Sequence, residues 1–492
     1  MQTNPAQPQT AADWLKLSVT FQQQGRYASM LDAARQASVL APDDPVARFH
    51  EIDCLLLAGE TRLALERLQQ IESDHPRDAP FLLRAGETYV QFNRLDDYHR
   101  CCECAHELAP TSQDTRLGLA RALIATGDAA RAETLLSEAT RERPEDGDAW
   151  LELARLRRWT AAENHVASIE RAVVGSPDPK SKAASCYALF KEMEDLGQHA
   201  RAMSWLQVGA KTLRSKLNYD VEFDESALAG IARNFPAERL RDAPATGPGR
   251  GAIFVVGLPR SGTTLVDRIL SAHPQVESLG EHRDLAYAVM RGGGINSTSR
   301  PAATPGSSPD PAAIGRSYLK AVEVYRTGRP HFVDKAPMNF LHCGLIRLAL
   351  PEARIVMLRR HPLDSCLAIY GTFFRERLSF AYDLQELGRY YVAWHHLSEH
   401  WRRAIPAQLL VMSYESLVAE PEAQIRRLLE HCGLGWDPRC LDFHLNESAV
   451  TTLSASQVRR PLYASSVGRW KKHARELEPL VRQLRESGIP LD

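Results

Sequence analysis

A period of 34 residues constrains the fold of the first half of the chain more than any other feature of the sequence. Prolines recur at this interval, and glycine or asparagine recurs with the same step (Pro42, Pro76, Pro110 and Pro144; Gly25, Gly59, Asn93 and Gly127). The glycine position allows a turn between two paired helices, and the proline ends the second helix. Small residues at other positions let the helices pack closely (Gly86, Ala120, Ala154, Ala64 and Ala132). The period predicts a stack of helical hairpins.

This pattern resembles the tetratricopeptide repeat. The match covers about residues 11–179, and a looser helical pattern continues over residues 180–241. We therefore expect a helical solenoid of this type over residues 11–240, preceded by a disordered N-terminus at residues 1–10. The concave face of such an array usually binds a peptide or a protein partner. The alternatives are that the array only braces the second half of the chain or that it forms a homodimer.

The second half of the chain has a different pattern. Residues 241–251 are rich in proline and glycine and continue neither pattern, so we predict a linker there. Beyond the linker, apolar strand-like runs alternate with helical patterns (252–256, 331–333, 354–358 and 408–412). This order predicts an α/β domain over residues 252–492 with a central parallel sheet, whose ligands bind at the carboxyl ends of the strands. Residues 292–312, rich in Gly, Ser, Thr and Pro, are either a lid or a tolerated insertion.

The first apolar run leads into a loop that can bind an anion. Gly257 and Gly262 lie five residues apart, and a helical pattern begins at Thr263. Backbone N–H groups of such a loop can meet a phosphate or a sulfate at the N-terminus of the helix. The spacing is P-loop-like, but Thr263 occupies the position at which an NTP-hydrolysing enzyme carries a lysine. The loop therefore indicates a chemistry other than NTP hydrolysis.

A series of short motifs resembles the sulfotransferase superfamily, and within it the tyrosylprotein sulfotransferase branch and its bacterial repeat-containing relatives. The resemblance covers about residues 252–480. It implies transfer of a sulfuryl group from 3′-phosphoadenosine 5′-phosphosulfate to an acceptor hydroxyl, on a peptide, a protein or a smaller molecule, without a metal and with adenosine 3′,5′-bisphosphate as the product. The motifs are PRSGTT at 259–264, AHP at 272–274, GEHR at 280–283, DKAP at 334–337, LRRHP at 358–362, YESL at 414–417, QVRRP at 457–461 and GRW at 468–470.

The resemblance also assigns residues to the donor site. The loop residues would bind the 5′-phosphosulfate, and Arg360 would bind the 3′-phosphate. The serine that the family places eight residues after that arginine is Ala368 here, and Ser365 or Thr372 are the candidates to replace it. Structural ion pairing is the alternative for Arg360. Tyr414 would lie near the adenosine, with packing as the alternative, and Arg460 would belong to a C-terminal segment that closes over the nucleotide. The expected donor-binding residues are therefore Arg260, Ser261, Gly262, Thr263, Thr264, Arg360, Tyr414 and Arg460.

Glu281, Lys335, Arg260 and Arg283 are the candidate catalytic residues. A carboxylate at Glu281 can take the proton of an attacking hydroxyl. An ammonium at Lys335 can offset charge on the leaving phosphate oxygen. By the resemblance Arg260 also lies near the transferring group and stabilises the departing nucleotide. By the resemblance Arg283 orients the acceptor, although GEHR has one residue fewer between Glu and Arg than the family motif. His282 is an alternative base, while Glu281 at a helix N-terminus and Lys335 on the surface could have only structural roles.

Composition and cysteine usage exclude several classes of protein. The formal net charge is −1 and the pI is near 7, so the sequence gives no argument for nucleic-acid binding. The sequence has no uninterrupted run of about 18 apolar residues, so it predicts no transmembrane segment. The polar N-terminus and the nine cysteines, an odd number in a long chain, lead us to expect a cytoplasmic protein with reduced thiols. Two clusters lack zinc-site spacing, so we predict no metal site (Cys101, Cys102 and Cys104; His395, His396 and His400).

Two other functions share parts of this pattern. The first is a scaffold, in which the repeats bind a partner and the second domain has lost turnover, as Ala368 would suggest. The second is a nucleotide kinase or an NTPase, which would need a lysine in the loop and an acidic metal ligand, and Asp267 within the helix is poorly placed for that ligand. Glu281 and Lys335 together favour the enzyme that transfers a sulfuryl group.

Overall fold

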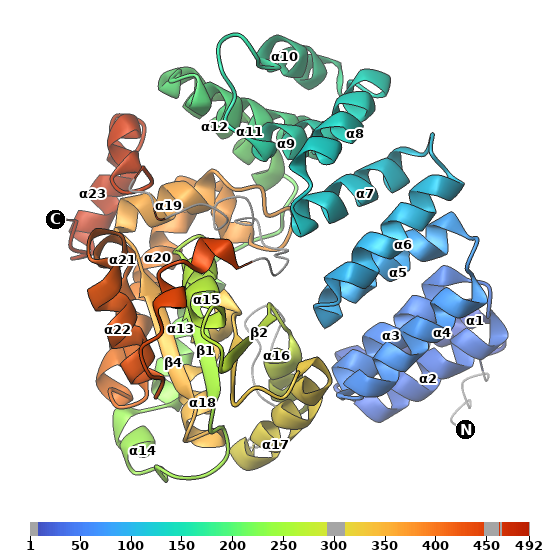
Figure 1. Cartoon of the computed structure of the whole chain (residues 1–492). Helices are drawn as coiled ribbons and strands as arrows, with labels where there is room; N and C mark the ends of the chain where they lie inside the picture. Colours follow the sequence, from blue (N-terminus) through green and yellow to red (C-terminus); the bar gives the residue numbers. More distant parts are fainter. Residues whose placement is uncertain (1–7, 293–309, 447–461, 463–464, 492) are drawn as a thin grey trace, which may run out of the picture.

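The chain forms a helical array that curves round one side of an α/β domain (Figure 1). This computed structural model describes residues 8–292, 310–446, 462 and 465–491. Residues 1–7 of the predicted N-terminal tail, most of segment 292–312, and Arg460 lie outside the described residues. No helix in the described ranges is long and apolar enough to cross a membrane.

The array consists of helical hairpins with the predicted 34-residue step. Each predicted turn residue has a positive φ, with 69° at Gly25, 82° at Gly59, 54° at Asn93 and 103° at Gly127. Each repeated proline lies two residues beyond the end of a second helix. The predicted helical repeat is therefore confirmed. The hairpins are α1 (Ala11–Gln23) with α2 (Tyr27–Leu40), α3 (Pro45–Ala58) with α4 (Thr61–Asp74), α5 (Ala79–Tyr89), which continues into η1 (Val90–Phe92), with α6 (Leu95–Leu108), and α7 (Gln113–Thr126) with α8 (Ala129–Glu142).

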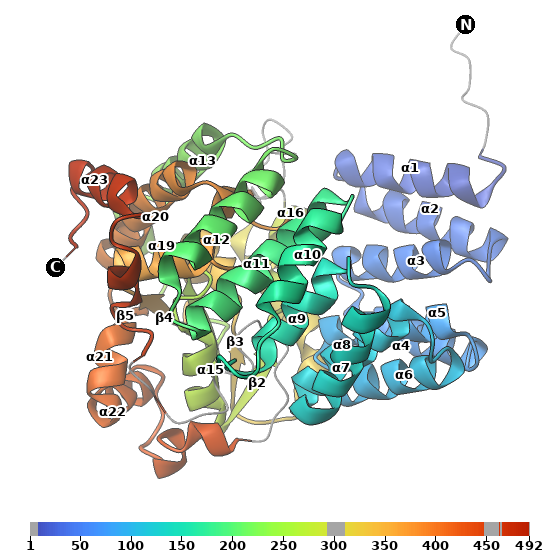
Figure 2. The ribbon, with the colours of Figure 1, turned by 90° about the horizontal axis from the view of Figure 1, so that it is seen from above.

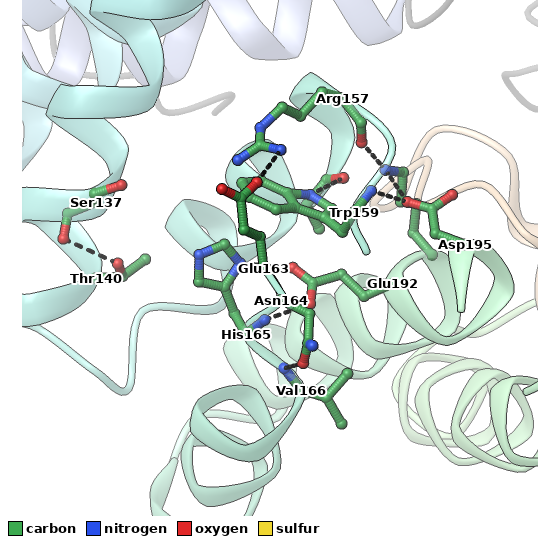
Figure 3. A network of polar contacts seen from close by, with 12 residues as sticks. Ser137, Thr140, Arg157, Trp159, Glu163, Asn164, His165, Val166, Glu192 and Asp195 are labelled. Carbon is green, nitrogen blue, oxygen red and sulfur yellow. Dashed lines mark hydrogen bonds and ion pairs between the residues drawn. The ribbon is translucent and has the colours of Figure 1, made fainter. Parts of the chain in front are cut away.

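The regular turn is lost in the next hairpin, between α9 (Gly147–Leu156) and α10 (Val166–Gly175). Residues 157–165 form a longer loop around the buried ring of Trp159, whose Nε1 donates to the carbonyl of Ala154 at 3.0 Å (Figure 3). His165 donates its backbone N–H to a carboxylate oxygen of Glu192 at 2.7 Å, and its Nδ1 lies 2.8 Å from the other oxygen. Because Glu192 lies on the next helix, these contacts hold the loop without a glycine turn.

The helical continuation ends close to the predicted linker. Helices α11 (Pro179–Asp195) and α12 (His199–Arg214) form a long hairpin, whose turn places Gly197 at a φ of 73°. Helices α13 (Val221–Asn234) and α14 (Ala237–Arg241) follow, and the first strand begins eleven residues later at Ala252. The helical pattern therefore persists as packed helices up to residue 241.

The α/β domain has a five-stranded parallel sheet with the order β2-β3-β1-β4-β5. The predicted central parallel sheet is therefore confirmed. Strand β1 lies in the middle and every one of its residues is buried, as expected of an unbroken apolar run. The strands are β1 (Ala252–Gly257), β2 (Val276–Gly280), β3 (His331–Asp334), β4 (Arg354–Arg359) and β5 (Leu409–Ser413).

Helices cover both faces of the sheet. Ile253 and Val255 of β1 belong to a core on one face, with α15 (Thr263–Ser271), α21 (Tyr414–Ala419) and α22 (Pro421–His431). Phe254 and Val256 face a core that is continuous with the array. The elements of the α/β domain that contribute to this second core are α16 (Asp284–Arg291), α17 (Pro311–Val322), η2 (Glu323–Tyr325), η3 (Pro337–His342), α18 (Cys343–Ala349), α19 (Pro362–Tyr370), η4 (Ser379–Tyr382), α20 (Leu384–Ala404) and α23 (Glu478–Glu486). The other described 3₁₀ turns are η5 (Pro438–Cys440), η6 (Phe443–Leu445) and η7 (Arg469–His473).

The array contacts the α/β domain in two separate zones (Figures 1 and 2). In the first zone α3 and α4 pack on α16 and α17, and Arg291 Nη1 donates to the carbonyl of Leu57 at 2.7 Å. In the second zone α11, α12 and α13 pack on η4, α20 and η7, and Arg214 Nε donates to Glu386 Oε2 at 2.6 Å. Both contacts agree with a bracing role for the array.

Candidate functional site

The predicted site residues follow the carboxyl ends of all five strands, so they meet at one edge of the sheet. The end of β1 and the loop after it contain three residues with a positive φ, which is 149° at Gly257, 68° at Arg260 and 107° at Gly262. A Cβ atom at Gly257 would lie 2.7 Å from the carbonyl oxygen of Leu358, and one at Gly262 would lie 2.7 Å from the ring of Tyr414. Only glycine fits at these two positions.

Arg260 takes a left-handed conformation that costs a non-glycine residue about 1–2 kcal/mol. Strain of this kind concentrates at binding and catalytic sites. Next to it, Ser261 is 1% exposed, and among the residues that the structure describes its Oγ has no hydrogen-bond partner. Gly262 gives α15 no side-chain cap, so an anion can take that place at the helix N-terminus. The loop, with Thr263 and Thr264 in the first helical turn, therefore suits a phosphate or a sulfate.

Glu281 and Lys335 form an ion pair across the ends of β2 and β3. The strands are joined at this point, because the backbone N–H of Lys335 donates to the carbonyl of Gly280 at 3.1 Å. The Lys335 side chain is 1% exposed, whereas that of Glu281 is 50% exposed. A buried ammonium thus contacts a carboxylate that faces solvent. Both groups lie at the carboxyl edge of the sheet, at which the loop after β1 also begins.

Two further carboxyl groups, those of Asp334 and Asp267, interact electrostatically with Lys335. The sequence analysis did not predict either as a neighbour of Lys335. Asp334 accepts a hydrogen bond from the hydroxyl of Tyr318 at 2.8 Å, and burial raises the pKa of Asp334 to about 7. Burial also raises the pKa of Asp267, while the charge of Lys335 and a hydrogen bond from Ser278 act in the opposite direction. The ammonium therefore lies within an acidic environment. In the sequence this environment could have been found from Asp334, which directly precedes Lys335 at the end of β3, and from Asp267, one turn into α15.

His282 and Arg283 lie toward the array. The buried ring of His282 stacks on Tyr325 with centroids 4.0 Å apart, and burial lowers its pKa to about 3. A ring enclosed in this way is out of reach of an acceptor, so the structure does not support His282 as a base. Arg283 is exposed, with its guanidinium 5.2 Å from the ring of Tyr287, and its charge acts on Asp53 of α3. Its role in orienting the acceptor stays a prediction.

Arg360 and Tyr414 meet on the other half of the sheet. The guanidinium of Arg360 lies 5.2 Å from the Tyr414 ring, and that ring packs against Gly262 of the loop. Both residues also contact Ser466: Arg360 Nη2 donates to its carbonyl, and the Tyr414 hydroxyl lies 2.7 Å from its Oγ. The neighbouring Arg359 instead binds Glu399 and Ser398 of α20. Only the second of the two adjacent arginines faces the loop.

The hydroxyl groups near Ala368 are turned back to the main chain. Ser365 Oγ donates to the carbonyl of Arg360 at 3.4 Å, and Thr372 Oγ1 donates to the carbonyl of Ala368 at 2.7 Å. Ser365 is therefore the nearer of the two predicted replacements to Arg360. Arg460 lies outside the described residues.

The structure contains a cluster of possible metal ligands that the sequence analysis missed. Among the described residues, donor atoms of Glu194, His199 and His473 lie within 4.8 Å of one another. Their sequence separation hid them, because the first two belong to the array and His473 follows 274 residues after His199. By contrast, Cys101 and Cys102 are buried in α6, as expected for small apolar side chains, and burial raises the pKa of Cys101 to about 12.

Comparison with known proteins identifies the families that the two halves of the chain match. Residues 252–438 match the sulfotransferase family, and residues 102–157 match the tetratricopeptide repeat. The chain therefore carries a sulfotransferase domain joined to tetratricopeptide repeats, as the sequence predicted.

Several proteins resemble parts of the chain. An uncharacterized protein of Aquifex aeolicus is 28% identical over 400 residues, which are 78% of this chain and 51% of that protein. Protein-tyrosine sulfotransferase A of Caenorhabditis elegans is 26% identical over 221 residues, 42% of this chain and 56% of that protein. Protein-tyrosine sulfotransferase of Drosophila melanogaster is 24% identical over 234 residues, 44% of this chain and 46% of that protein. The chain thus spans about half the length of each of these relatives.

Solved structures also match each half of the chain. A sulfotransferase from Alicyclobacillus acidocaldarius is 16% identical, with a TM-score of 0.29, over 50% of this chain and 98% of that chain. A tetratricopeptide repeat protein from Parabacteroides merdae is 18% identical, with a TM-score of 0.31, over 44% of this chain and 82% of that chain.

Proposed function

We propose that this protein transfers a sulfuryl group from 3′-phosphoadenosine 5′-phosphosulfate to an acceptor hydroxyl and releases adenosine 3′,5′-bisphosphate. The observation that carries the proposal is the pairing of Glu281 with Lys335 beside a glycine loop that has no lysine. A base and a cation at adjacent strand ends suit a transfer in which one oxygen loses a proton and another gains charge.

The residues present fit the donor. The buried Ser261 hydroxyl and the uncapped start of α15 suit the 5′-phosphosulfate, together with Arg260, Thr263 and Thr264. Arg360 and Tyr414 would hold the bisphosphate and the adenosine, and Arg460 would close over them by resemblance. A sulfuryl group bears less charge than a phosphoryl group, so side-chain cations and N–H groups can stabilise it without Mg²⁺.

Each catalytic residue would have a separate role. Glu281 takes the proton of the acceptor hydroxyl as the acceptor oxygen forms its bond to sulfur. The bond from sulfur to the bridging oxygen breaks, its electron pair stays on the phosphate, and Lys335 and Arg260 stabilise that charge. Arg283 would orient the acceptor.

The ion pair also implies an order of events. Lys335 has to leave Glu281 before its ammonium can offset charge on the donor. Donor binding would therefore free the Glu281 carboxylate for the acceptor.

We propose a peptide or a protein as the acceptor. The relatives named protein-tyrosine sulfotransferases favour this class, and the array contacts the end of β2, the strand that leads to Glu281. Asn93, in the turn after η1, donates its Nδ2 to the carbonyl of Ser278 at 3.5 Å, and its Oδ1 would lie 3.1 Å from a Cβ atom at Gly280. A segment held on the array would thus lie close to the base.

We also propose a cytoplasmic location. All nine cysteines are free, and eight of them are buried. A chain with this many unpaired thiols suits a reducing compartment.

A scaffold without turnover is the second candidate, and Ala368 favours it, because the nearby hydroxyls of Ser365 and Thr372 are directed to main-chain carbonyls. One experiment separates the two functions. The purified protein is incubated with donor labelled in the sulfuryl group and with a cell lysate, beside a Glu281→Ala variant. We expect labelled product with the wild type only. A wild type that binds the bisphosphate but labels nothing would favour the scaffold.

A further inference from the structure

The C-terminal segment 465–473, which we call the C-terminal strap, connects the donor half of the site to the array. On the donor side the strap is held by Asp364, a buried residue in the first turn of α19. Asp364 Oδ2 accepts the N–H of Gly468 at 2.6 Å, and Oδ1 accepts the N–H of Trp470 at 2.9 Å. These bonds set the position of Ser466, which contacts Arg360 and Tyr414.

On the array side the strap is held by Glu194, in the last turns of α11. Arg469 donates from Nε and Nη2 to Glu194 Oε2 at 3.0 and 2.7 Å. The other carboxylate oxygen faces two histidines: His473 Nε2 lies 3.0 Å away, out of line for a regular hydrogen bond, and His199 Nδ1 lies 2.6 Å away. One carboxylate therefore meets three basic side chains.

This carboxylate is ionised although the protein encloses it. The Glu194 side chain is only 7% exposed. Burial opposes ionisation, but the contact with His473 and the charge of Arg469 hold the pKa of Glu194 well below its usual range. Removing the charge would leave Arg469 without its partner in a partly buried place, which is costly.

A metal ion is the other occupant that Glu194, His199 and His473 could accept. Four exposed or partly exposed cations argue against it, because they line the groove beside His199 (Arg201, Lys471, Lys472 and Arg475). Arg469 already binds the same carboxylate. The ion pair with Arg469 satisfies the carboxylate without a metal.

We propose that Glu194 is a positioning residue for the donor site: the last long hairpin of the array holds the C-terminal strap, and the strap holds Ser466 against Arg360 and Tyr414. The inference rests on the proposed function, which gives donor binding to those two residues. It makes donor affinity depend on a residue of the array that lies 275 positions before Arg469. The chemistry at Glu281 and Lys335 would be independent of it.

The test compares Glu194→Gln with Glu170→Gln. Glu170 of α10 forms an ion pair with Arg201 of α12 at 2.8 Å. Like Glu194, Glu170 is a glutamate of the array that pairs with an arginine, but its partner belongs to the array and not to the strap. We expect Glu194→Gln to raise the Kd for adenosine 3′,5′-bisphosphate and the KM for the donor about tenfold, and to leave kcat at saturating donor within about twofold. Glu170→Gln should change none of them.

A double-mutant cycle separates positioning from general damage. Arg469→Gln should reproduce the effect of Glu194→Gln, and the double variant should be no worse than either, because both remove the same contact. Hydrogen exchange of peptides covering 465–473 should become faster in each variant, with the sheet unchanged. If Glu194→Gln fails to fold, Arg469→Gln on the strap provides the same test.

The outcomes distinguish this inference from the proposed function. Unchanged bisphosphate affinity in Glu194→Gln and Arg469→Gln would overturn the inference. A chelator that raises the Kd of the wild type would assign the cluster to a metal and overturn it as well. A wild type that binds no bisphosphate would instead contradict the proposed function, while the exchange of the strap would still report whether Glu194 holds it.

Discussion

The two halves of the site are built in different ways. On the β2–β3 half, Glu281 and Lys335 contact each other directly from adjacent strand ends. On the β4–β5 half, Arg360 and Tyr414 are completed by Ser466, from a segment outside the sheet. The sheet alone therefore fixes the half that we propose to be catalytic, whereas the half that we propose to bind the donor depends on how the rest of the chain is held.

The array contacts the two halves of the site through different hairpins. Early repeats contact β2 and α16, where Asn93 lies beside Ser278. The last long hairpin contacts the C-terminal strap through Glu194. Changes in the two parts of the array should thus affect different properties of the enzyme.

The largest effect is expected on the catalytic half. Lys335→Ala should lower turnover about 10²-fold or more and leave the affinity for adenosine 3′,5′-bisphosphate within about threefold, because the ammonium stabilises charge that grows only during transfer. Steady-state rates and calorimetry measure the two quantities. The matched control is Lys320→Ala, which removes an exposed lysine 3.7 Å from Glu60. Unchanged turnover in Lys335→Ala would remove this residue from the mechanism.

Glu281→Gln should lower turnover by about 10²-fold, since an amide cannot take the proton of the acceptor. Its bisphosphate affinity should stay within about threefold of that of the wild type, because in this account Glu281 contacts the acceptor and not the donor. The same two measurements apply. Full activity would show that another group accepts the proton, and a loss of bisphosphate affinity would contradict the separation of the two halves.

Arg360→Ala should act on the donor half. Loss of a charged donor of hydrogen bonds weakens binding by about 1.5–3 kcal/mol, or about 10- to 100-fold in the Kd of the bisphosphate. Arg359→Ala is the matched control, because this arginine binds Glu399 and Ser398. It should lower the melting temperature and leave the Kd unchanged. Equal effects of both variants on the Kd would contradict the assignment of Arg360.

The smallest effect is expected in the array. Asn93 has a φ of 54°, a left-handed conformation that asparagine tolerates better than alanine. Asn93→Ala should reduce the free energy of unfolding by about 1 kcal/mol in denaturant titrations. Asn93→Gly should restore most of this stability, because glycine adopts the conformation at little cost. Equal stability of the two variants would show that the turn is not strained.

How much the sequence could predict depends on the separation of the residues in contact. The turns at Gly59 and Asn93 need only local residues, so the period found them. Glu281 and Lys335 were predicted to share an edge because carboxyl ends of parallel strands meet there. Nothing local relates Glu194 to Arg469, or Ser466 to Tyr414, since each contact joins distant helices or loops. The orientation of His282 toward Tyr325 likewise follows from tertiary packing.

The central claim is that the loop from Arg260 to Thr264 and the basic residues at the other strand ends form one site for a sulfonated adenylate. Calorimetric titration with adenosine 3′,5′-bisphosphate and with ADP, each with and without Mg²⁺, tests it most directly. We predict that the bisphosphate binds at least about tenfold more tightly than ADP and that Mg²⁺ changes neither affinity, because cationic side chains replace the metal. Tighter, Mg²⁺-dependent binding of ADP would contradict the account and would favour a nucleotide kinase or an NTPase.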